Sequence, residues 1–339
     1  MRKLSVILVG LLFSIPVIAQ KRAILIGVSD YPEGSGWCKL NAHNDVTLLK
    51  DALAPEWDII TLEDGKATHD GIVSTLRNAA ITVSSGDTVL IHFSGHGQQM
   101  LPIETDSRHD PDMLDEAIIP YDAKKDWSPD YTGQNHIRDN EFGDLIEPIR
   151  NNAGVSGLVV VVLDACHSDS MQRIPDSAGG SIIGYRGTAD IFGRNITADE
   201  ERNRYKRDTS RVIVDNNASV VYLSACQAYS RNAEITDPEG VGYGSLSYAV
   251  AGALKEGGIR DINKFLDCVV VAMDTLVPYQ FPGIRASFDY QRPVISKDVK
   301  PQVNTSEDNK GAHLKAYMIA IALALALSLF IVIWRKKRV

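Results

Sequence analysis

Residues 157–170 read GLVVVVLDACHSDS, an apolar run that leads to a cysteine. Residues 157–163 contain no polar side chain and are rich in β-branched valine, so they predict a strand that is buried on both faces. Residues 87–99, DTVLIHFSGHGQQ, repeat the arrangement, with His96 between two glycines after an apolar run. Because parallel strands end at one edge of a sheet, the two stretches predict that Cys166 and His96 meet at the same rim.

The surrounding sequence alternates short apolar runs with segments of helical spacing. This order predicts an α/β fold, in which a mostly parallel sheet is covered by helices on both faces. The polar segments 98–115 and 169–215 are interpreted as loops. Besides the two runs above, we expect strands at 22–28, 57–62 and 219–223, and helices at 41–53, 68–81, 138–149, 243–254 and 261–276.

Both ends of the chain carry apolar segments. Residues 1–19 have a basic start, an apolar middle and a small-residue end, which predicts a cleaved secretory signal, with a buried strand or an anchor as the alternatives. Residues 316–334 are uncharged and long enough to cross a bilayer, and basic residues follow them, which predicts a transmembrane helix with a cytoplasmic tail at 335–339; a buried core helix is the alternative. We therefore expect an exported, single-pass protein whose main domain, residues 20–295, is periplasmic or extracytoplasmic, with a stalk at 296–315.

Composition excludes some classes of protein. The chain has 339 residues and a formal net charge of −8, so there is no basic surplus that would indicate a nucleic-acid partner. Its four cysteines, Cys38, Cys166, Cys226 and Cys268, are too few for a disulfide-built scaffold of this size. We expect no obligatory disulfide.

The pairing of Cys166 with His96 suits nucleophilic catalysis. A cysteine attacks a carbonyl carbon as the thiolate, and a nearby histidine helps to form it and protonates the leaving group. The backbone amides of Gly97 and Cys166 are candidates for the oxyanion hole. A zinc site is the competing interpretation, with ligands drawn from His92, His96, His109 and His167.

Several motifs together resemble the caspase-like cysteine peptidases (clan CD, peptidase family C14), closest to the metacaspase and paracaspase branch. HFSGHG and LDACHSDS resemble the histidine and cysteine motifs of this family. Further similar segments keep the family order: RAILIGVSDY, LNAHNDVTLLKDAL, DPDMLDEAIIPYD, IRDNEFGDLI, LSACQAYSRNAE and GYGSLSYAVAGAL. The resemblance implies a three-layer caspase-like sandwich with about six strands and a Cys166–His96 dyad. It divides the domain into a large segment, 20–171, a loop, 172–214, and a small segment, 215–295.

Acidic residues near the dyad indicate what the enzyme would cut. Asp164 lies two residues before Cys166, so strand alternation points both side chains to the same side. An acid there favours arginine or lysine before the scissile bond, and the resemblance places Asp45 in the same S1 pocket. The alternatives are a strand-end cap for Asp164 and a solvated helix face for Asp45. Relatives often carry another acid after ACQ, where this chain has Ala228 and Tyr229, with Glu234 further on, so we expect a weaker negative field in the pocket.

The loop 172–214 is rich in arginine, and the family separates its two segments there. We therefore expect self-cleavage at one of the basic residues of this region, with 202–211 favoured. These residues are Arg173, Arg186, Arg194, Arg202, Arg204, Lys206, Arg207 and Arg211. A charged flexible loop is the alternative interpretation.

A calcium ion is also conceivable, although no cofactor is required by the proposed chemistry. Some metacaspases place calcium-binding acids in the segment after the histidine, and oxygen donors of this kind suit the ion. A solvated acidic loop is the alternative. The candidate ligands are Asp106, Asp110, Asp112 and Asp115.

The sequence thus predicts a cysteine endopeptidase that acts on proteins or peptides. The alternatives are a catalytically silent caspase-fold module for binding or signalling at the cell envelope, and a transpeptidase that uses the same acyl-enzyme. The natural substrate and the oligomeric state are not determined by these patterns.

Overall fold

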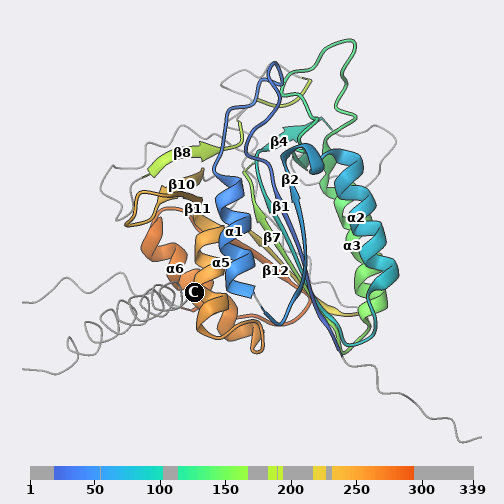
Figure 1. Cartoon of the computed structure of the whole chain (residues 1–339), viewed down its shortest axis with the longest axis vertical. Helices are drawn as coiled ribbons and strands as arrows, with labels where there is room; N and C mark the ends of the chain where they lie inside the picture. The colour runs from blue at the N-terminus through green and yellow to red at the C-terminus, as the bar shows by residue number, and fades with distance from the viewer. Residues whose placement is uncertain are drawn as a thin grey trace, which may run out of the picture. The chain divides into compact units, whose positions relative to one another are not determined.

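Six strands form the central sheet, in the order β12-β9-β7-β3-β1-β2 (Figure 1). This computed structural model describes residues 19–53, 55–101, 114–166, 182–188, 190–193, 217–226 and 231–293. Neighbouring strands run parallel except β12, which pairs antiparallel with β9. The strands are β1 (Lys21–Gly27), β2 (Asp58–Glu63), β3 (Thr88–Ser94), β7 (Leu158–Asp164), β9 (Ser219–Ser224) and β12 (Gly283–Ala286).

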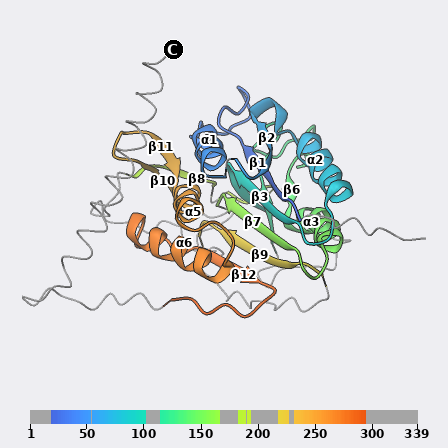
Figure 2. The ribbon, with the colours of Figure 1, turned by 60° about the horizontal axis from the view of Figure 1, so that its bottom comes forward.

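Helices cover both faces of this sheet, which gives three layers. Helices α2 and α3 lie on one face, and α1, α5 and α6 lie on the other (Figure 2). A short 3₁₀ turn, η1 (Asp64–Lys66), precedes α2, and the Thr68 side chain caps α2 by accepting a hydrogen bond from the Gly71 amide. The helices are α1 (Ala42–Leu53), α2 (His69–Thr82), α3 (Asp139–Ala153), α5 (Ser245–Glu256) and α6 (Ile262–Leu276).

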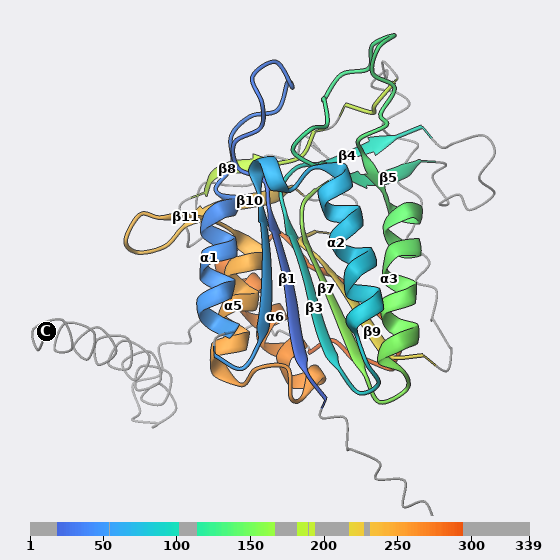
Figure 3. The same ribbon diagram turned by 45° about the vertical axis from the view of Figure 1, so that its right-hand side comes forward.

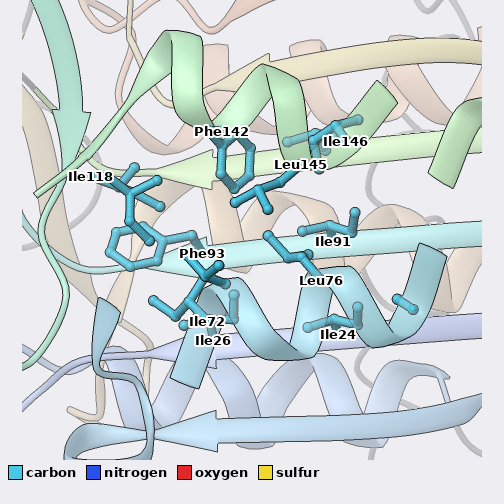
Figure 4. Close-up of a cluster of buried hydrophobic side chains, with 14 of the residues drawn as sticks. Ile24, Ile26, Ile72, Leu76, Ile91, Phe93, Ile118, Phe142, Leu145 and Ile146 are labelled. Carbon is cyan, nitrogen blue, oxygen red and sulfur yellow. The ribbon is translucent and has the colours of Figure 1, made fainter. Parts of the chain in front are cut away.

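Two apolar cores explain why β1, β3 and β7 are apolar along most of their length. Figure 4 shows Ile91 and Phe93 of β3 packed with Leu76 of α2 and with Phe142 of α3. Leu90, which directly precedes Ile91, belongs to the second core, beneath α1, α5 and α6. Successive strand residues point to opposite faces, so a strand with a core on each side needs apolar residues at nearly every position.

Two smaller antiparallel sheets lie at the end of the central sheet where β1, β3 and β7 finish (Figure 3). The prediction of featureless loops was therefore wrong in part, because β4 and β8 lie within those segments. One sheet contains β4 (Gly97–Met100), β5 (Asp115–Ile118) and β6 (Ile137–Arg138), and the other contains β8 (Ile182–Arg186), β10 (Asn232–Thr236) and β11 (Gly242–Gly244).

The predicted parallel strands and helices are confirmed, with ends shifted by a few residues. The antiparallel edge strand β12 was not named from the sequence. Among the described residues, we find no helix with the length and apolarity needed to span a bilayer. The predicted transmembrane segment, residues 316–334, lies outside the described residues, as does the predicted signal up to residue 18.

Candidate active site

His96 and Cys166 lie at the same rim of the central sheet. Strands β3 and β7 are parallel neighbours, and Ser94 is in register with Asp164. His96 and Cys166 each follow these paired residues by two positions. The Gly95 amide donates to the Asp164 carbonyl over 3.3 Å and so extends the pairing beyond the strand ends.

Both ring nitrogens of His96 have hydrogen-bond partners. Its Nδ1 atom accepts a hydrogen bond from the Gly187 amide over 2.9 Å, so the ring proton is on Nε2. Nε2 then donates to the Cys38 carbonyl, also over 2.9 Å. Trp37 stacks on the ring with its centroid 4.8 Å away. The backbone carbonyl of Cys38 therefore orients the imidazole and fixes its tautomer.

The imidazole of His96 is held neutral. Its side chain is buried, and burial lowers its pKa to about 4, although the hydrogen bond to the Cys38 carbonyl works in the opposite direction. Arg186 lowers the pKa further through charge repulsion. The neutral ring can act as a base through Nδ1, whose lone pair accepts the hydrogen bond from the Gly187 amide.

A fully buried guanidinium occupies an acidic pocket beside the two strand ends. Arg186, the last residue of β8, donates from Nη2 to Asp45 Oδ2 over 2.7 Å and to Glu234 Oε1 over 3.0 Å. Its Nη1 atom lies 3.4 Å from Asp164 Oδ1 and donates to the Ser94 hydroxyl over 2.7 Å. The pocket is therefore built for one planar cation.

The pKa values of Asp45 and Asp164 are shifted in opposite directions. Burial raises the pKa of Asp45 to about 6, against the attraction of Arg186, and the charge of Asp164 adds to the rise. Burial also opposes ionisation of Asp164, but Arg186 together with hydrogen bonds from Ser247 and Asn232 outweighs it, so the pKa of Asp164 is below its usual range. The carboxylates in turn raise the pKa of Arg186 despite its burial.

Ala228 and Tyr229 lie outside the described residues. Glu234 supplies a third acid around Arg186, and it is 4% exposed. The backbone amide of Asn41 donates a hydrogen bond to Glu234 Oε1 over 2.8 Å and holds the carboxylate in place. Sequence reasoning missed this role because Glu234 lies on β10 and faces the pocket only once β10 pairs with β8.

The strand β8 adds to the sheet as an extended peptide would. Arg186 is in register with Asn232, and Tyr185 with Ala233 of β10, in an antiparallel arrangement. The guanidinium carbon of Arg231 lies 4.9 Å from the centroid of the Tyr185 ring. An extended segment that joins an exposed sheet edge and places one side chain in a pocket is a common mode of peptide recognition.

Gly187, which follows Arg186, fits closely against Cys166. Its φ is +92°, and a Cβ atom placed on it would lie 1.9 Å from the Cys166 carbonyl oxygen. Only glycine fits at this position without a shift of the backbone. The Arg186–Gly187 peptide thus lies between the acidic pocket, His96 and Cys166, and Gly187 lies beside the predicted oxyanion-hole residue Gly97, whose carbonyl oxygen is 3.2 Å from the same Cβ position.

Cys166 is 1% exposed, and its closest described thiol partner is Cys226. The two Sγ atoms are 3.1 Å apart, with Cys226 as the donor. None of the four cysteines forms a disulfide bond. Cys226 follows β9, the neighbour of β7.

The metal-site predictions gain no support from the described residues. Among these residues, no group of three or more His, Cys, Asp or Glu side chains is arranged to hold a metal. Asp115 is buried and forms an ion pair with Arg138. Asp106, Asp110 and Asp112 lie outside the described residues, as do His109 and His167. His92 instead contacts the Ser247 hydroxyl, 2.8 Å away.

Comparison with known proteins agrees with this geometry. A family model described as the caspase domain, Peptidase C14, matches residues 20–300. Metacaspase-8 of Arabidopsis thaliana is 28% identical over 172 residues, which cover 48% of this chain and 40% of that protein. Metacaspase-7 of the same plant is 31% identical over 160 residues, or 44% of this chain and 35% of the relative. The chain thus spans less than half the length of these two relatives.

Similarity over a longer range is found with more distant proteins. Metacaspase-1B of Aspergillus fumigatus is 24% identical over 292 residues, covering 75% of this chain and 67% of that protein. The crystal structure of protein GSU0716 from Geobacter sulfurreducens superposes with a TM-score of 0.53 at 20% identity, and the match covers 81% of this chain. At this identity the structural likeness supports the fold alone.

Proposed function

Because the chain belongs to the caspase domain family of cysteine peptidases, on its metacaspase branch, we propose that it is an endopeptidase that cleaves after arginine or lysine. One observation supports this specificity most directly. Arg186 fills a pocket of three acids, and the amide of the next residue donates to His96 Nδ1. The chain's own segment therefore lies in the cleft as a substrate would.

The chemistry follows from these positions. Cys166 attacks the carbonyl carbon of the arginine as the thiolate, after its proton has passed to His96. The amides of Gly97 and Cys166 stabilise the oxyanion. His96 Nδ1 then protonates the leaving nitrogen, which in the present arrangement is the nitrogen of Gly187, 2.9 Å away. Water hydrolyses the thioester and regenerates Cys166.

Arginine should be preferred to lysine at the cleaved position. The pocket acids contact both terminal nitrogens of the Arg186 guanidinium, at 2.7 Å, 3.0 Å and 3.4 Å. A lysine ammonium is a single point charge and cannot reach all of these partners at once.

A panel of fluorogenic peptides with arginine, lysine, aspartate or leucine before the reporter tests the specificity. The full-length protein should cut the arginine peptide fastest and the aspartate peptide least, and Cys166→Ala should cut none. Preference for aspartate or leucine would reject the proposed specificity. Failure to cut any peptide, together with no labelling of Cys166 by a thiol-reactive peptidyl probe, would favour the silent binding module.

Self-cleavage is a further part of the proposal, and the cleft favours the bond between Arg186 and Gly187. Residues 202–211, the region favoured by the sequence, lie outside the described residues. Until that bond is cut or β8 leaves, the segment competes with other substrates for the pocket. The uncut chain is therefore expected to have low activity in trans.

Export, the membrane tether and calcium dependence remain proposals that rest on the sequence. Protease accessibility of the domain in intact cells tests the orientation, and full sensitivity only after lysis would contradict it. Activity that is unchanged by EGTA would contradict a calcium requirement.

A further inference from the structure

The thiol of Cys226 lies next to the thiol of Cys166, the candidate nucleophile. Its Sγ atom lies 3.1 Å from Cys166 Sγ, whereas a disulfide bond is about 2.05 Å long. Neither residue forms a disulfide bond. The two sulfurs are therefore in contact but are not bonded, and a shift of about 1 Å separates the two states.

The central sheet fixes this proximity. Strands β7 and β9 are parallel neighbours, with Leu163 in register with Ser224, and the Ala225 amide donates to the Leu163 carbonyl over 3.1 Å. Cys166 and Cys226 each lie two residues beyond the ends of these strands.

The Cys226 thiol holds its proton and donates it toward Cys166. Its pKa is raised well above the usual value, first because of this S–H hydrogen bond and second because of burial. Donation from Cys226 stabilises negative charge on the Cys166 sulfur, which is the charge that a nucleophile or a peroxide-reactive thiol needs. The two thiols thus have different roles.

We propose that Cys166 and Cys226 form a redox pair, in which Cys226 is the resolving thiol and a hydroperoxide is the oxidant. The Cys166 thiolate attacks one peroxide oxygen, which breaks the O–O bond, and Cys166 becomes a sulfenic acid. Cys226 then attacks the sulfenic sulfur, and the S–O bond breaks as water leaves. Overall, two thiols and one hydrogen peroxide give one disulfide and two waters, so the thiols lose the two electrons that the peroxide gains.

The pairing would switch off the nucleophile reversibly. A sulfur in a disulfide cannot attack a peptide carbonyl, and a dithiol reductant restores it. Without a resolving thiol, a sulfenic acid proceeds to the sulfinic acid, which is not restored by such reductants. Cys226 is half-buried at this edge of the sheet.

Mass spectrometry tests the pairing independently of peptidase activity. The full-length protein is treated with hydrogen peroxide, its remaining thiols are blocked with N-ethylmaleimide, and the digest is searched for a peptide that links Cys166 to Cys226. The linked peptide should form in the wild type, disappear with dithiothreitol, and be completely lost in Cys226→Ser, where Cys166 should instead accumulate as sulfinic acid. Cys268→Ser, which removes a half-buried thiol on α6, is the control and should behave as the wild type.

Cys226→Ala is the second variant, in case the serine disturbs the fold. The proposal is overturned if wild-type Cys166 oxidises to the sulfinic acid as fast as in both Cys226 variants, or if Cys226 is found blocked as a free thiol while Cys166 is oxidised. A linked peptide in a protein that cuts no substrate would still support the pairing and would count only against the peptidase assignment.

Discussion

Three acidic side chains converge on a single guanidinium in the pocket around Arg186, and each does so from a different element. Asp45 comes from α1, Asp164 from β7 and Glu234 from β10. In the proposed function, the arginine of a substrate would take the place of Arg186. Removal of one acid should therefore weaken the binding of every arginine substrate, because one buried N–H group of the guanidinium would lose its charged acceptor.

Glu234→Gln tests the acid that the sequence did not identify. It keeps the shape and an acceptor oxygen for Asn41, but it removes the charge. We expect kcat/KM for arginine peptides to fall at least about tenfold, which is about 1.4 kcal/mol. Glu239→Gln, at an exposed position in the turn between β10 and β11, is the matched control and should leave kcat/KM unchanged. An unchanged value in Glu234→Gln would remove Glu234 from the pocket.

Arg231 predicts a preference one residue further from the scissile bond. Its guanidinium lies over the Tyr185 ring, in a cation–π contact. With arginine fixed before the reporter, a peptide with tyrosine before it should be cut about fivefold faster than one with alanine, which corresponds to about 1 kcal/mol. Arg231→Ala should reduce this ratio toward one and leave the arginine requirement intact. Equal rates for the two peptides in the wild type would contradict the contact's role in selection.

At the scale of the element, β8 is the segment that places Arg186 among the three acids. It pairs with β10 along its length and ends with Arg186 in the pocket and Gly187 against Cys166. In the proposed function, β8 is a substrate for self-cleavage, and until it is cut it competes with other substrates for the three acids. Its removal exposes the acids, which then favour any incoming cation.

Substitutions in β8 test self-cleavage directly. Arg186→Gln should abolish the cut between residues 186 and 187, Arg186→Lys should retain it at a reduced rate, and Arg202→Ala should leave it unaffected. Gly187→Ala should slow it, because the new methyl group would overlap the Cys166 carbonyl. Intact-mass measurement of the fragments identifies the bond. A cut that persists in Arg186→Gln but vanishes in Arg202→Ala would return the site to 202–211.

At the scale of the whole molecule, the central sheet is the part that the sequence predicts well. Runs such as 157–163 are apolar because they are buried on both faces, so their composition alone indicates their place. The short strands of the two smaller sheets carry no such signal. β8 reads as a polar loop, and its role appears only when it pairs with β10, about fifty residues later.

The residues of the candidate site also differ in how well the sequence predicts them. His96 and Cys166 stand out because each follows an apolar run and neighbours unusual residues. The Cys38 carbonyl cannot be identified from sequence, since any residue supplies that group. Glu234 and Cys226 are ordinary residues until strand order places them beside Asp45 and Cys166.

Buried histidines predict how the stability of the whole domain responds to acid. Burial lowers the pKa of His92 and of His136 to about 3, and that of His96 to about 4. In the unfolded chain these histidines have a pKa of about 6.5. Below that pH the unfolded state binds more protons than the folded state, so the folded state loses stability. Each histidine should cost about 2 kcal/mol of unfolding free energy at about pH 5. The raised pKa of Asp45, about 6, acts in the opposite direction but belongs to one group with a smaller shift.

The unfolding free energy of Cys166→Ala, which cannot process itself, should therefore be largest near neutral pH and should fall as the pH is lowered from about 6.5 toward about 4. Urea denaturation at a series of pH values measures it. His136→Gln removes one of the titrating groups, and its amide can still meet the Tyr131 hydroxyl or Gln98. The unfolding free energy of this variant should fall less steeply over the same pH range, even if it is lower at neutral pH. Equal slopes in the two proteins would mean that His136 is not held neutral by burial.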